Sequence, residues 1–486
     1  MQYVKILYAA VLFLTAWSCS GQTAQQPNIV FISVDDLRPQ LGCYGFDYMN
    51  TPNLDKLASQ STVFKNHFTQ VPTCGASRYS MLTGKYPTHP SELRNNVIVE
   101  KITNQKSSNQ PETFIHLLKK NGYYTSGIGK ISHSADGYVY GYNEPVSKQR
   151  ELPLSWDTLQ FDTGPWETGW DAFFAYSGGQ SRTTLQKKVK PYEMASVPDS
   201  GYPDGLTANL SIKELTRLKK LNRPFFLGVG FLKPHLPFNA PSQYWNLYQK
   251  NNIPLSPNPE APENVNSTAL TNSGEFNNGY QKAEEHPSAE HPVSKEYARR
   301  LRHAYFAAIS YIDAQIGKVI SELDRLNLTE NTIIIVWGDH GWHLGDHSIW
   351  GKHTLFERAL KSALIIKMPG TSKSGKIADG LVESIDIYPT LCELCNINPP
   401  EDLDGSSLVP LLNGSTAKEK KAALGFWHNG YTVRNENFRL MYFPKEKENE
   451  FALFNHQNDP YETTNIADSH PEIVQEMKLL LKPFNE

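Results

Sequence analysis

Short, almost continuously apolar runs recur along the chain, and helical patterns lie between them. The first run covers Asn28–Val34, and similar runs occur at 225–230, 332–337 and 363–368. A run of this kind is typical of a strand that is buried on both faces of a parallel sheet. Because strands that alternate with helices pack into layers, the pattern predicts an α/β sandwich with a large, mostly parallel mixed sheet between helices.

The spacing of apolar residues predicts helices in the intervening segments. Two short helices are expected at 52–58 and 112–118. The longest is expected at 295–326, where apolar residues recur at helical spacing. The residues that set this period are Leu301, Tyr305, Ile309, Ile312, Ile316, Ile320 and Leu323.

Two long segments have no clear period. Residues 136–204 are rich in Trp, Tyr, Gly and Pro, and residues 251–292 are rich in Asn, Pro and Glu. Loops of this length inside a compact domain are usually functional or disordered. We expect both segments to be insertions that shape a substrate site.

The pattern changes beyond about residue 405. Short alternating runs predict antiparallel strands, and a final amphipathic run predicts a closing helix. These runs lie at 431–435, 438–443, 450–455 and 471–481. We therefore expect a main domain over 25–405 and a smaller C-terminal α+β subdomain with a short antiparallel sheet over 406–486.

The first residues have the pattern of an export signal. Lys5 supplies a positive charge, residues 6–17 form a short apolar run, and small residues follow. The run is too short to span a bilayer comfortably, so the sequence predicts a signal peptide over 1–21. Cys19 follows Ala-Trp-Ser, a loose match to a lipidation motif. Two locations stay open: an outer-membrane lipoprotein, which would touch the membrane only through a lipid on Cys19, and a plain periplasmic or secreted protein.

The net charge bears on the class of partner, and the cysteines bear on disulfides and on metal or redox sites. The chain has 486 residues and a formal net charge of −3, so nothing indicates a nucleic-acid partner. Its five cysteines suggest no disulfide framework. Cys392 and Cys395 lie in an apolar, helix-like stretch without a second ligand pair nearby. We expect core residues there rather than a redox or metal pair.

The segment from Cys74 to Gly84 predicts a nucleophile at the start of a short helix. Arg78 follows Cys74 by four residues, so both side chains would lie on one helix face. The free N–H groups and positive dipole end of a helix N-terminus suit an anion such as a sulfate or phosphate ester. A cysteine alone is as often a small core residue. Ser77, Arg78 and the following Leu-Thr-Gly favour the functional interpretation.

Acidic pairs follow two of the predicted strands. Asp35 and Asp36 come after the first strand, and Asp339 and His340 come after the strand at 332–337. Ligand sites gather at the carboxyl ends of such strands. Buried carboxylates need compensation, and a cluster of three suits a hard cation such as Ca²⁺ or Mg²⁺. Imidazole is a softer ligand, which leaves open whether His340 binds the ion or only flanks it.

Four further cationic or histidine side chains stand in short polar motifs: Lys130, His133, His235 and Lys352. Each alone is more often a surface charge or a satisfied histidine. Cleavage of a sulfate ester by attack at sulfur needs cations on the sulfate oxygens and an acid for the leaving alcohol. Convergence of these four side chains on the acidic pairs would supply both.

Taken together, these motifs resemble those of one protein family. They are Asp35-Asp36-Leu37-Arg38-Pro39, the Cys74 segment, Gly129-Lys130-Ile131-Ser132-His133, Lys233-Pro234-His235-Leu236-Pro237-Phe238 and Asp339-His340-Gly341-Trp342-His343. In this order they are similar to the iduronate-2-sulfatase-like branch of the type I, formylglycine-dependent sulfatases of the alkaline phosphatase superfamily. The resemblance runs from about Asn28 to Asp468 and implies an alkaline-phosphatase-like fold.

The resemblance implies a modified residue and a metal ion. Cys74 would be oxidised to formylglycine (3-oxoalanine) by a formylglycine-generating enzyme. One hydroxyl of the hydrated aldehyde would attack sulfur, and the second would later release the sulfate. The implied metal is Ca²⁺ in preference to Mg²⁺. Its implied ligands are Asp35, Asp36, Cys74, Asp339 and His340.

The resemblance also implies roles for the cationic and histidine side chains. Arg78 and Lys130 would hold and polarise the nucleophile's oxygens, assisted by His133. Lys352 and His235 would bind sulfate oxygens, and His235 is the implied proton donor to the leaving alcohol. The departures from the family are small in the Cys74 segment, where Ala76 stands at a position more often occupied by proline and Gly75 adds flexibility. The two irregular segments do not match the lysosomal enzyme well.

The predicted function is an exported sulfatase that acts on a sulfated polysaccharide or its oligosaccharides. Two substrate classes are open: algal polymers of the ulvan type, with sulfated rhamnose beside uronic acids, and 2-O-sulfated uronates of glycosaminoglycans. A phosphodiesterase or phosphonate hydrolase of the same superfamily is one alternative, which the full Cys74 segment disfavours. A catalytically inactive, glycan-binding surface lipoprotein is another, which the filled catalytic positions disfavour.

Overall fold

The computed structural model describes residues 26–370, 375–414, 420–444 and 450–484. The predicted signal peptide and Cys19 lie outside these residues. Among the described helices, none is long and apolar enough to cross a membrane.

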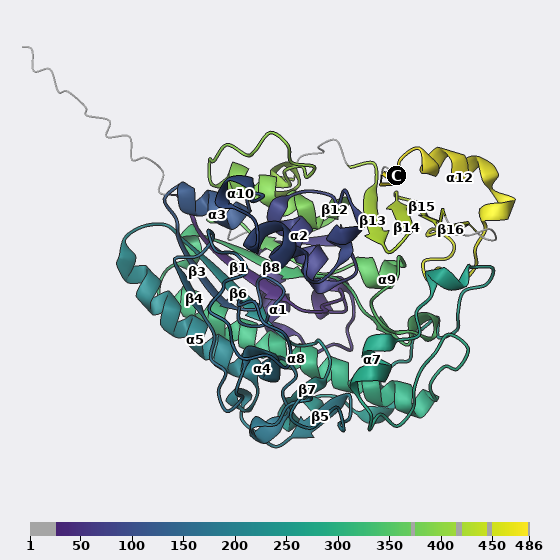
Figure 1. The fold of residues 1–486 in the computed structure, drawn as a ribbon, viewed down its shortest axis with the longest axis horizontal. Coiled ribbons are helices and arrows are strands. Elements are labelled where there is room, and N and C mark those ends of the chain that lie inside the picture. Colours follow the sequence, from purple (N-terminus) through teal and green to yellow (C-terminus); the bar gives the residue numbers. More distant parts are fainter. Residues whose placement is uncertain (1–25, 371–374, 415–419, 445–449, 485–486) are drawn as a thin grey trace, which may run out of the picture.

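An eight-stranded mixed sheet forms the centre of the protein (Figure 1). Its strands, in spatial order, are β12 (Lys376–Glu383), β2 (Thr62–Phe68), β11 (Leu364–Lys367), β8 (Thr332–Gly338), β1 (Asn28–Val34), β6 (Phe225–Phe231), β3 (Tyr124–Gly129) and β4 (Thr158–Gln160). Strand β11 runs antiparallel to both of its neighbours, and the other pairings are parallel. The predicted α/β architecture is confirmed.

The central strand β1 shows why both faces of the sheet are covered. Val30 and Ile32 pack in one core with the long helix α8 (Lys295–Arg325), whereas Ile29 and Phe31 pack in a second core on the opposite face. This alternation is the period of an extended strand. The helices on the α8 side include α1 (Pro52–Ala58) and α5 (Pro203–Leu218), and those on the other side include α2 (Cys74–Thr83), α3 (Phe114–Lys120) and α10 (Ile387–Leu394).

The strand register brings the acidic pairs together. Val34 of β1 lies beside both Phe231 of β6 and Gly338 of β8, so these three strands end at the same level. The residues that follow β1 and β8 must therefore meet at one edge of the sheet, as the sequence predicts.

Several boundaries and strands differ from the prediction. Helix α3 begins at Phe114 rather than at 112, because the Thr113 side chain caps it by accepting a hydrogen bond from the backbone N–H of His116. Strands β2, β3 and β12 are missed because polar residues or glycines interrupt their apolar pattern. The irregular segments contain short elements: β4, α4 (Gly169–Phe173), β5 (Tyr192–Ala195) and α7 (Gly274–Gly279).

Smaller elements complete the main body. Strand β5 pairs with β7 (Phe238–Pro241), and β9 (His343–Leu344) pairs with β10 (Trp350–Gly351). The remaining short α-helices are α6 (Ser242–Trp245), α9 (Glu357–Leu360) and α11 (Val409–Leu412).

Cys392 and Cys395 are free and buried in the core, and no disulfide joins the described cysteines.

The C-terminal part forms a four-stranded antiparallel sheet. Its strands are β13 (Ala423–Trp427), β14 (Gly430–Arg434), β15 (Phe438–Tyr442) and β16 (Phe451–Asn455), and helix α12 (Pro471–Lys478) packs against it. The sequence predicts three of these strands but not β13, whose short apolar run has no alternation. The proposed boundary at residue 405 stays a prediction.

A buried ion cluster joins this sheet to the main body. The Arg439 guanidinium, 1% exposed, lies 2.6 Å from the Glu357 carboxylate of α9 and 2.7 Å from the Glu462 carboxylate. His456 lies 3.0 Å from Glu462, and Arg434 lies 3.2 Å from Glu357. Burial opposes the charge of Glu357, but the surrounding cations hold its pKa well below the ordinary value. The cluster depends on each charge having its partner.

We expect the Arg439→Ala substitution to destabilise the protein strongly. It leaves two buried carboxylates short of a cation, which costs about 3–5 kcal/mol of unfolding free energy. The midpoint of urea unfolding, followed by circular dichroism, measures the loss. Lys120→Ala is the control, because Lys120 is 55% exposed and pairs at 2.7 Å with Glu112, whose side chain is 28% exposed. Equal midpoints for the two variants would contradict the prediction.

Candidate active site

The acidic pairs meet at the carboxyl ends of β1 and β8. Asp35, Asp36 and Asp339 are fully buried, and so is His340. The backbone N–H of Asp36 donates to Asp339 Oδ1 at 2.9 Å, which ties the two strand ends together. Asp36 has a φ of 60°, so its backbone turns sharply directly after the strand.

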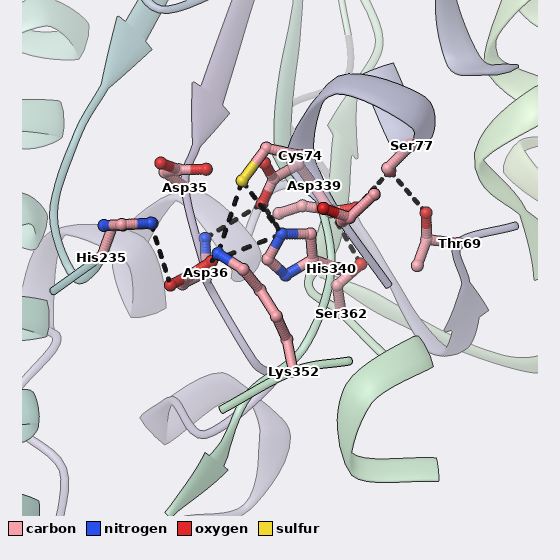
Figure 2. Close-up of polar contacts among 12 residues, drawn as sticks. Asp35, Asp36, Thr69, Cys74, Ser77, His235, Asp339, His340, Lys352 and Ser362 are labelled. Carbon is pink, nitrogen blue, oxygen red and sulfur yellow. Dashed lines mark hydrogen bonds and ion pairs between the residues drawn. The ribbon is translucent and has the colours of Figure 1, made fainter. Parts of the chain in front are cut away.

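Cys74 lies at the first residue of α2 and points into this cluster (Figure 2). Its Sγ is 3.3 Å from His340 Nε2, and Lys352 Nζ donates to it at 3.5 Å. The predicted helix and the position of Cys74 at its start are both present. Burial raises the pKa of the Cys74 thiol well above its ordinary value.

The start of α2 is fixed by contacts of two residues that follow Cys74, Ser77 and Gly75. The Ser77 hydroxyl donates to the backbone carbonyl of Asp339 and lies 2.5 Å from Thr69 Oγ1. A Cβ on Gly75 would lie only 2.2 Å from the Asn95 carbonyl oxygen. Gly75 therefore allows a close backbone approach, which a residue with a Cβ would prevent; that it also adds flexibility stays a prediction.

Arg78 is buried beneath the cluster and holds its carboxylates. Its guanidinium lies 2.9 Å from Asp339 Oδ2 and 3.3 Å from Asp35 Oδ1. It also donates to the carbonyl oxygens of Lys130 at 2.6 Å and Ile131 at 3.2 Å, after β3. The hydrogen bonds and ion pairs of Arg78 thus reach the carboxylates, the Ser33 hydroxyl and the backbone around the nucleophile, and none among the described residues reaches Cys74 itself.

Lys130 supplies a second buried cation. Its Nζ lies 2.8 Å from Asp35 Oδ2. Burial opposes the charge of Lys130, yet the Asp35 carboxylate raises the lysine's pKa above its ordinary value. Burial likewise opposes the charge of Asp35, but Lys130, His235 and Arg78 hold the pKa of this carboxyl well below its ordinary value. Both groups are charged at neutral pH.

The cluster fits a hard cation. Four residues each offer one ligand atom, and these atoms all lie within 4.8 Å of one another: Asp35, Cys74, Asp339 and His340. Asp36 Oδ2 is buried and has no hydrogen-bond partner among the described residues, and burial raises the pKa of Asp36 to about 7 although Lys352 opposes this. Such a carboxylate oxygen lacks the partner that a metal ion would provide. Three carboxylates are the donors that Ca²⁺ and Mg²⁺ prefer.

His235 and Lys352 lie on the open side of the cluster. Lys352 Nζ is 2.9 Å from Asp36 Oδ1, and His235 Nε2 is 3.9 Å from Asp36 Oδ2. His235 Nδ1 lies 2.7 Å from the backbone carbonyl oxygen of Leu236, which can only accept a hydrogen bond, so Nδ1 carries a hydrogen and donates it. Burial and the Lys352 charge lower the pKa of His235.

Glu275 of α7 is a functional candidate that the sequence did not indicate. Its carboxylate bridges the two side chains just described, with 2.8 Å to His235 Nε2 and 3.4 Å to Lys352 Nζ. Although burial opposes its charge, these two neighbours hold the pKa of Glu275 well below its ordinary value. It stands in the irregular segment 251–292, where no periodicity or motif distinguishes it from other acidic residues.

His133 lies in the pocket wall. Its ring centroid is 5.5 Å from that of Trp170, and its Nδ1 is buried without a hydrogen-bond partner among the described residues. Burial, together with the Lys130 charge, lowers its pKa well below the ordinary value. His133 is therefore neutral in this arrangement.

A pocket of about 300 Å³ opens above Cys74. Its base contains Lys130, His235 and Lys352, and its wall comes from both irregular segments, which is the placement expected from the sequence. The segment 136–204 contributes Tyr142, Phe173, Phe174, Arg182 and Lys187, and the segment 251–292 contributes Gly274, Glu275, Asn278 and Gly279. The arrangement joins a nucleophile position, a carboxylate cluster and cations for an anionic ester in one small cavity.

Solved structures share this fold. A phosphonate monoester hydrolase of Agrobacterium radiobacter has a TM-score of 0.75 and 22% identity, over 94% of this chain and 95% of that chain. A protein in complex with its substrate D-glucosamine-2-N,6-O-disulfate has a TM-score of 0.70 and 21% identity, over 94% of this chain and 97% of that chain. These likenesses show the alkaline-phosphatase-like fold.

Sequence comparison is more specific. Iduronate 2-sulfatase of Mus musculus is 32% identical over 404 residues, which are 77% of this chain and 69% of the mouse protein. A sulfatase of Formosa agariphila is 27% identical over 99% of this chain and 93% of its own length. The C-terminal family model of N-sulphoglucosamine sulphohydrolase matches residues 345–485. The sulfatase family model matches residues 27–397, and the chain therefore belongs to the sulfatase family of sulfuric ester hydrolases.

Proposed function

We propose that this sulfatase is exported and hydrolyses sulfate esters of a sulfated polysaccharide or its oligosaccharides, after conversion of Cys74 to formylglycine. One observation carries the proposal: Cys74 begins α2 at the base of the pocket, with His340 Nε2 at 3.3 Å and Lys352 Nζ at 3.5 Å from its Sγ. The maturation partner is a formylglycine-generating enzyme. The location is the periplasm, the outer membrane through a lipid on Cys19, or the medium.

The mechanism assigns the nucleophile to residue 74. Formylglycine, as a hydrated aldehyde, would supply one hydroxyl for attack on sulfur, and loss of the proton of its second hydroxyl would break the carbon–oxygen bond to sulfate and restore the aldehyde. Lys352 is close enough to the side chain of residue 74 to orient its oxygen. Arg78 and Lys130 neutralise Asp35 and Asp339 beside it, and these two cations polarise the nucleophile. The neutral His133 assists as a hydrogen-bonding group, since its buried Nδ1 has no partner among the described residues.

The leaving alcohol needs a proton, for which His235 is placed. Both ring nitrogens of His235 face acceptors, the Leu236 carbonyl oxygen at Nδ1 and the Glu275 carboxylate at Nε2. Burial and the Lys352 charge lower the pKa of His235, but the Glu275 carboxylate beside Nε2 opposes this and favours the doubly protonated ring. His235 gives the Nε2 proton to the sugar oxygen as the ester bond breaks, and Lys352 holds a sulfate oxygen.

Ca²⁺ is the ion proposed for the carboxylate cluster. Asp35, Asp36 and Asp339 would hold it, with His340 and residue 74 completing the site. Bound there, a divalent cation would stabilise negative charge on the sulfate oxygens. Mg²⁺ is the other hard cation that these oxygen ligands suit.

Two substrate classes are proposed, ulvan-type rhamnose and uronate sulfates and 2-O-sulfated uronates of glycosaminoglycans. The sequence relatives support a sulfated sugar, since they include the iduronate 2-sulfatases of mouse and human, which are 32% and 30% identical to this chain. The similarity to phosphonate monoester hydrolases concerns the fold alone. The pocket volume of about 300 Å³ lies at the lower end for small-molecule sites, which suits one or two sugar units.

We expect matured protein to release sulfate from one class of defined sugar. The chain is co-expressed with a formylglycine-generating enzyme, and sulfate is measured by ion chromatography after incubation with ulvan, heparin, chondroitin, carrageenan and fucan oligosaccharides. Cys74→Ala is expected to release none, because it removes the nucleophile.

The mass of the peptide that contains residue 74 reports the formylglycine independently. Confirmed formylglycine without sulfate release from any sugar would contradict the proposal. Phosphonate and phosphodiester substrates, and binding of the polymers by Cys74→Ala, would then decide between the hydrolase alternative and the inactive glycan-binding lipoprotein.

We also expect Ca²⁺ to stabilise the folded protein by binding the carboxylate cluster. A ligand that binds only the folded state raises the melting temperature with its concentration. Treatment with a chelator should lower the melting temperature and abolish sulfate release, and added Ca²⁺ should restore both. Asp36→Asn should reduce the Ca²⁺-dependent rise, whereas Asp379→Asn, at a side chain that is 72% exposed, should retain it. An unchanged melting temperature over a Ca²⁺ titration of wild type would contradict the metal site.

A further inference from the structure

The pocket contains cations of two kinds. Lys130 and Lys352 at its base are each paired with buried carboxylates. Arg182 and Lys187, both from the irregular segment 136–204, also line the pocket. Neither of these two forms an ion pair with a described residue. The positive charge of the wall is therefore uncompensated, unlike that of the base.

Aromatic contacts hold Arg182 in place. The centre of its guanidinium lies 3.3 Å from the ring centroid of Phe174 and 5.6 Å from that of Tyr280. A Cβ on Gly279 would lie 3.1 Å from Arg182 Nη1, so α7 closes the other side. A guanidinium that stacks on a ring keeps its in-plane N–H donors available for a planar or tetrahedral anion.

Arg182 lies close to the reacting groups but does not contact them. The Phe174 ring packs against the Arg182 guanidinium and also lies near His235, with 6.3 Å between the two ring centroids. A pyranose ring is comparable in size to this phenyl ring. A sugar whose sulfate contacts Lys352 at the base of the pocket can therefore direct another substituent toward Arg182.

We propose that Arg182 binds a second negative group of the substrate, a carboxylate or another sulfate, in addition to the sulfate that is removed. Lys187 at the exposed rim adds to the attraction. A partly buried guanidinium that has no ion pair with a described residue is better stabilised when an anion accepts its hydrogen bonds, and its fork matches carboxylate and sulfate oxygens. This inference rests on the proposed sulfatase function and makes Arg182 a determinant of substrate specificity.

The test compares matched pairs of substrates. One pair is a 2-O-sulfated uronic acid disaccharide and its carboxyl-reduced form, and the other is a disulfated hexose and its monosulfated form. For wild type we expect kcat/KM to be at least about tenfold higher for the member with the second anion, as for a charge-assisted hydrogen bond. Arg182→Gln should reduce this ratio toward one, and Arg182→Lys should retain part of it.

Arg223→Gln is the matched control. Arg223 also lies over an aromatic ring, 5.6 Å from the centroid of Tyr124, and forms no ion pair with a described residue, but it does not line the pocket. It should keep the wild-type ratio. Dependence on Arg182 in only one pair identifies the second anion as the carboxylate or as the sulfate, and either result supports the proposal.

Three outcomes separate the inference from the function on which it rests. Equal kcat/KM for both members of each pair in wild type overturns the inference but leaves the sulfatase function intact. An equal loss on both members in Arg182→Gln shows a structural role and also overturns it. If matured wild type releases no sulfate at all, the proposed function fails. Calorimetric binding of the acidic and reduced disaccharides to wild type and Arg182→Gln then decides whether Arg182 recognises the second anion.

Discussion

The structure depends on one constraint: Asp35, Asp36 and Asp339 are buried together at one edge of the sheet, so each needs a compensating charge. Arg78 and Lys130 provide part of it, and in doing so they connect α2 and the end of β3 to the ends of β1 and β8. The level ends of the strands make the meeting possible. Cys74 acquires its position because the helix that carries it is attached to these carboxylates through Arg78 and Ser77.

The features that the sequence predicts are those in which burial or chemistry leaves a local pattern. Strands β1 and β8 are continuous apolar runs because helices cover both of their faces, and α8 has a clear helical period. Strand β2 is not predicted, because Lys65 and Asn66 interrupt its apolar residues although pairing in the sheet holds it extended. Such strands form because they pair with distant segments of the chain, and this pairing leaves no local pattern in the sequence.

The base and the wall of the pocket also differ in how well the sequence alone indicates their residues. Cys74, the acidic pairs and the base cations stand in short motifs, so the sequence alone indicates them. Glu275 and Arg182 stand in irregular segments, and only the folded chain shows that they face the same cavity. The groups proposed for the reaction are thus recognisable locally, whereas the groups that select a substrate depend on how two long loops pack.

The ion cluster around Arg439 bears on whether the C-terminal sheet is a separable module. Glu357 belongs to the main body, only five residues beyond Lys352, yet its buried charge is balanced by Arg434 and Arg439 of the C-terminal sheet. A chain shortened before this sheet would lose these two cations and keep only Lys361 of the main body, 3.2 Å from the Glu357 carboxylate. The ion cluster therefore couples the two parts, and another C-terminal sheet could replace this one only if it supplied cations opposite Glu357.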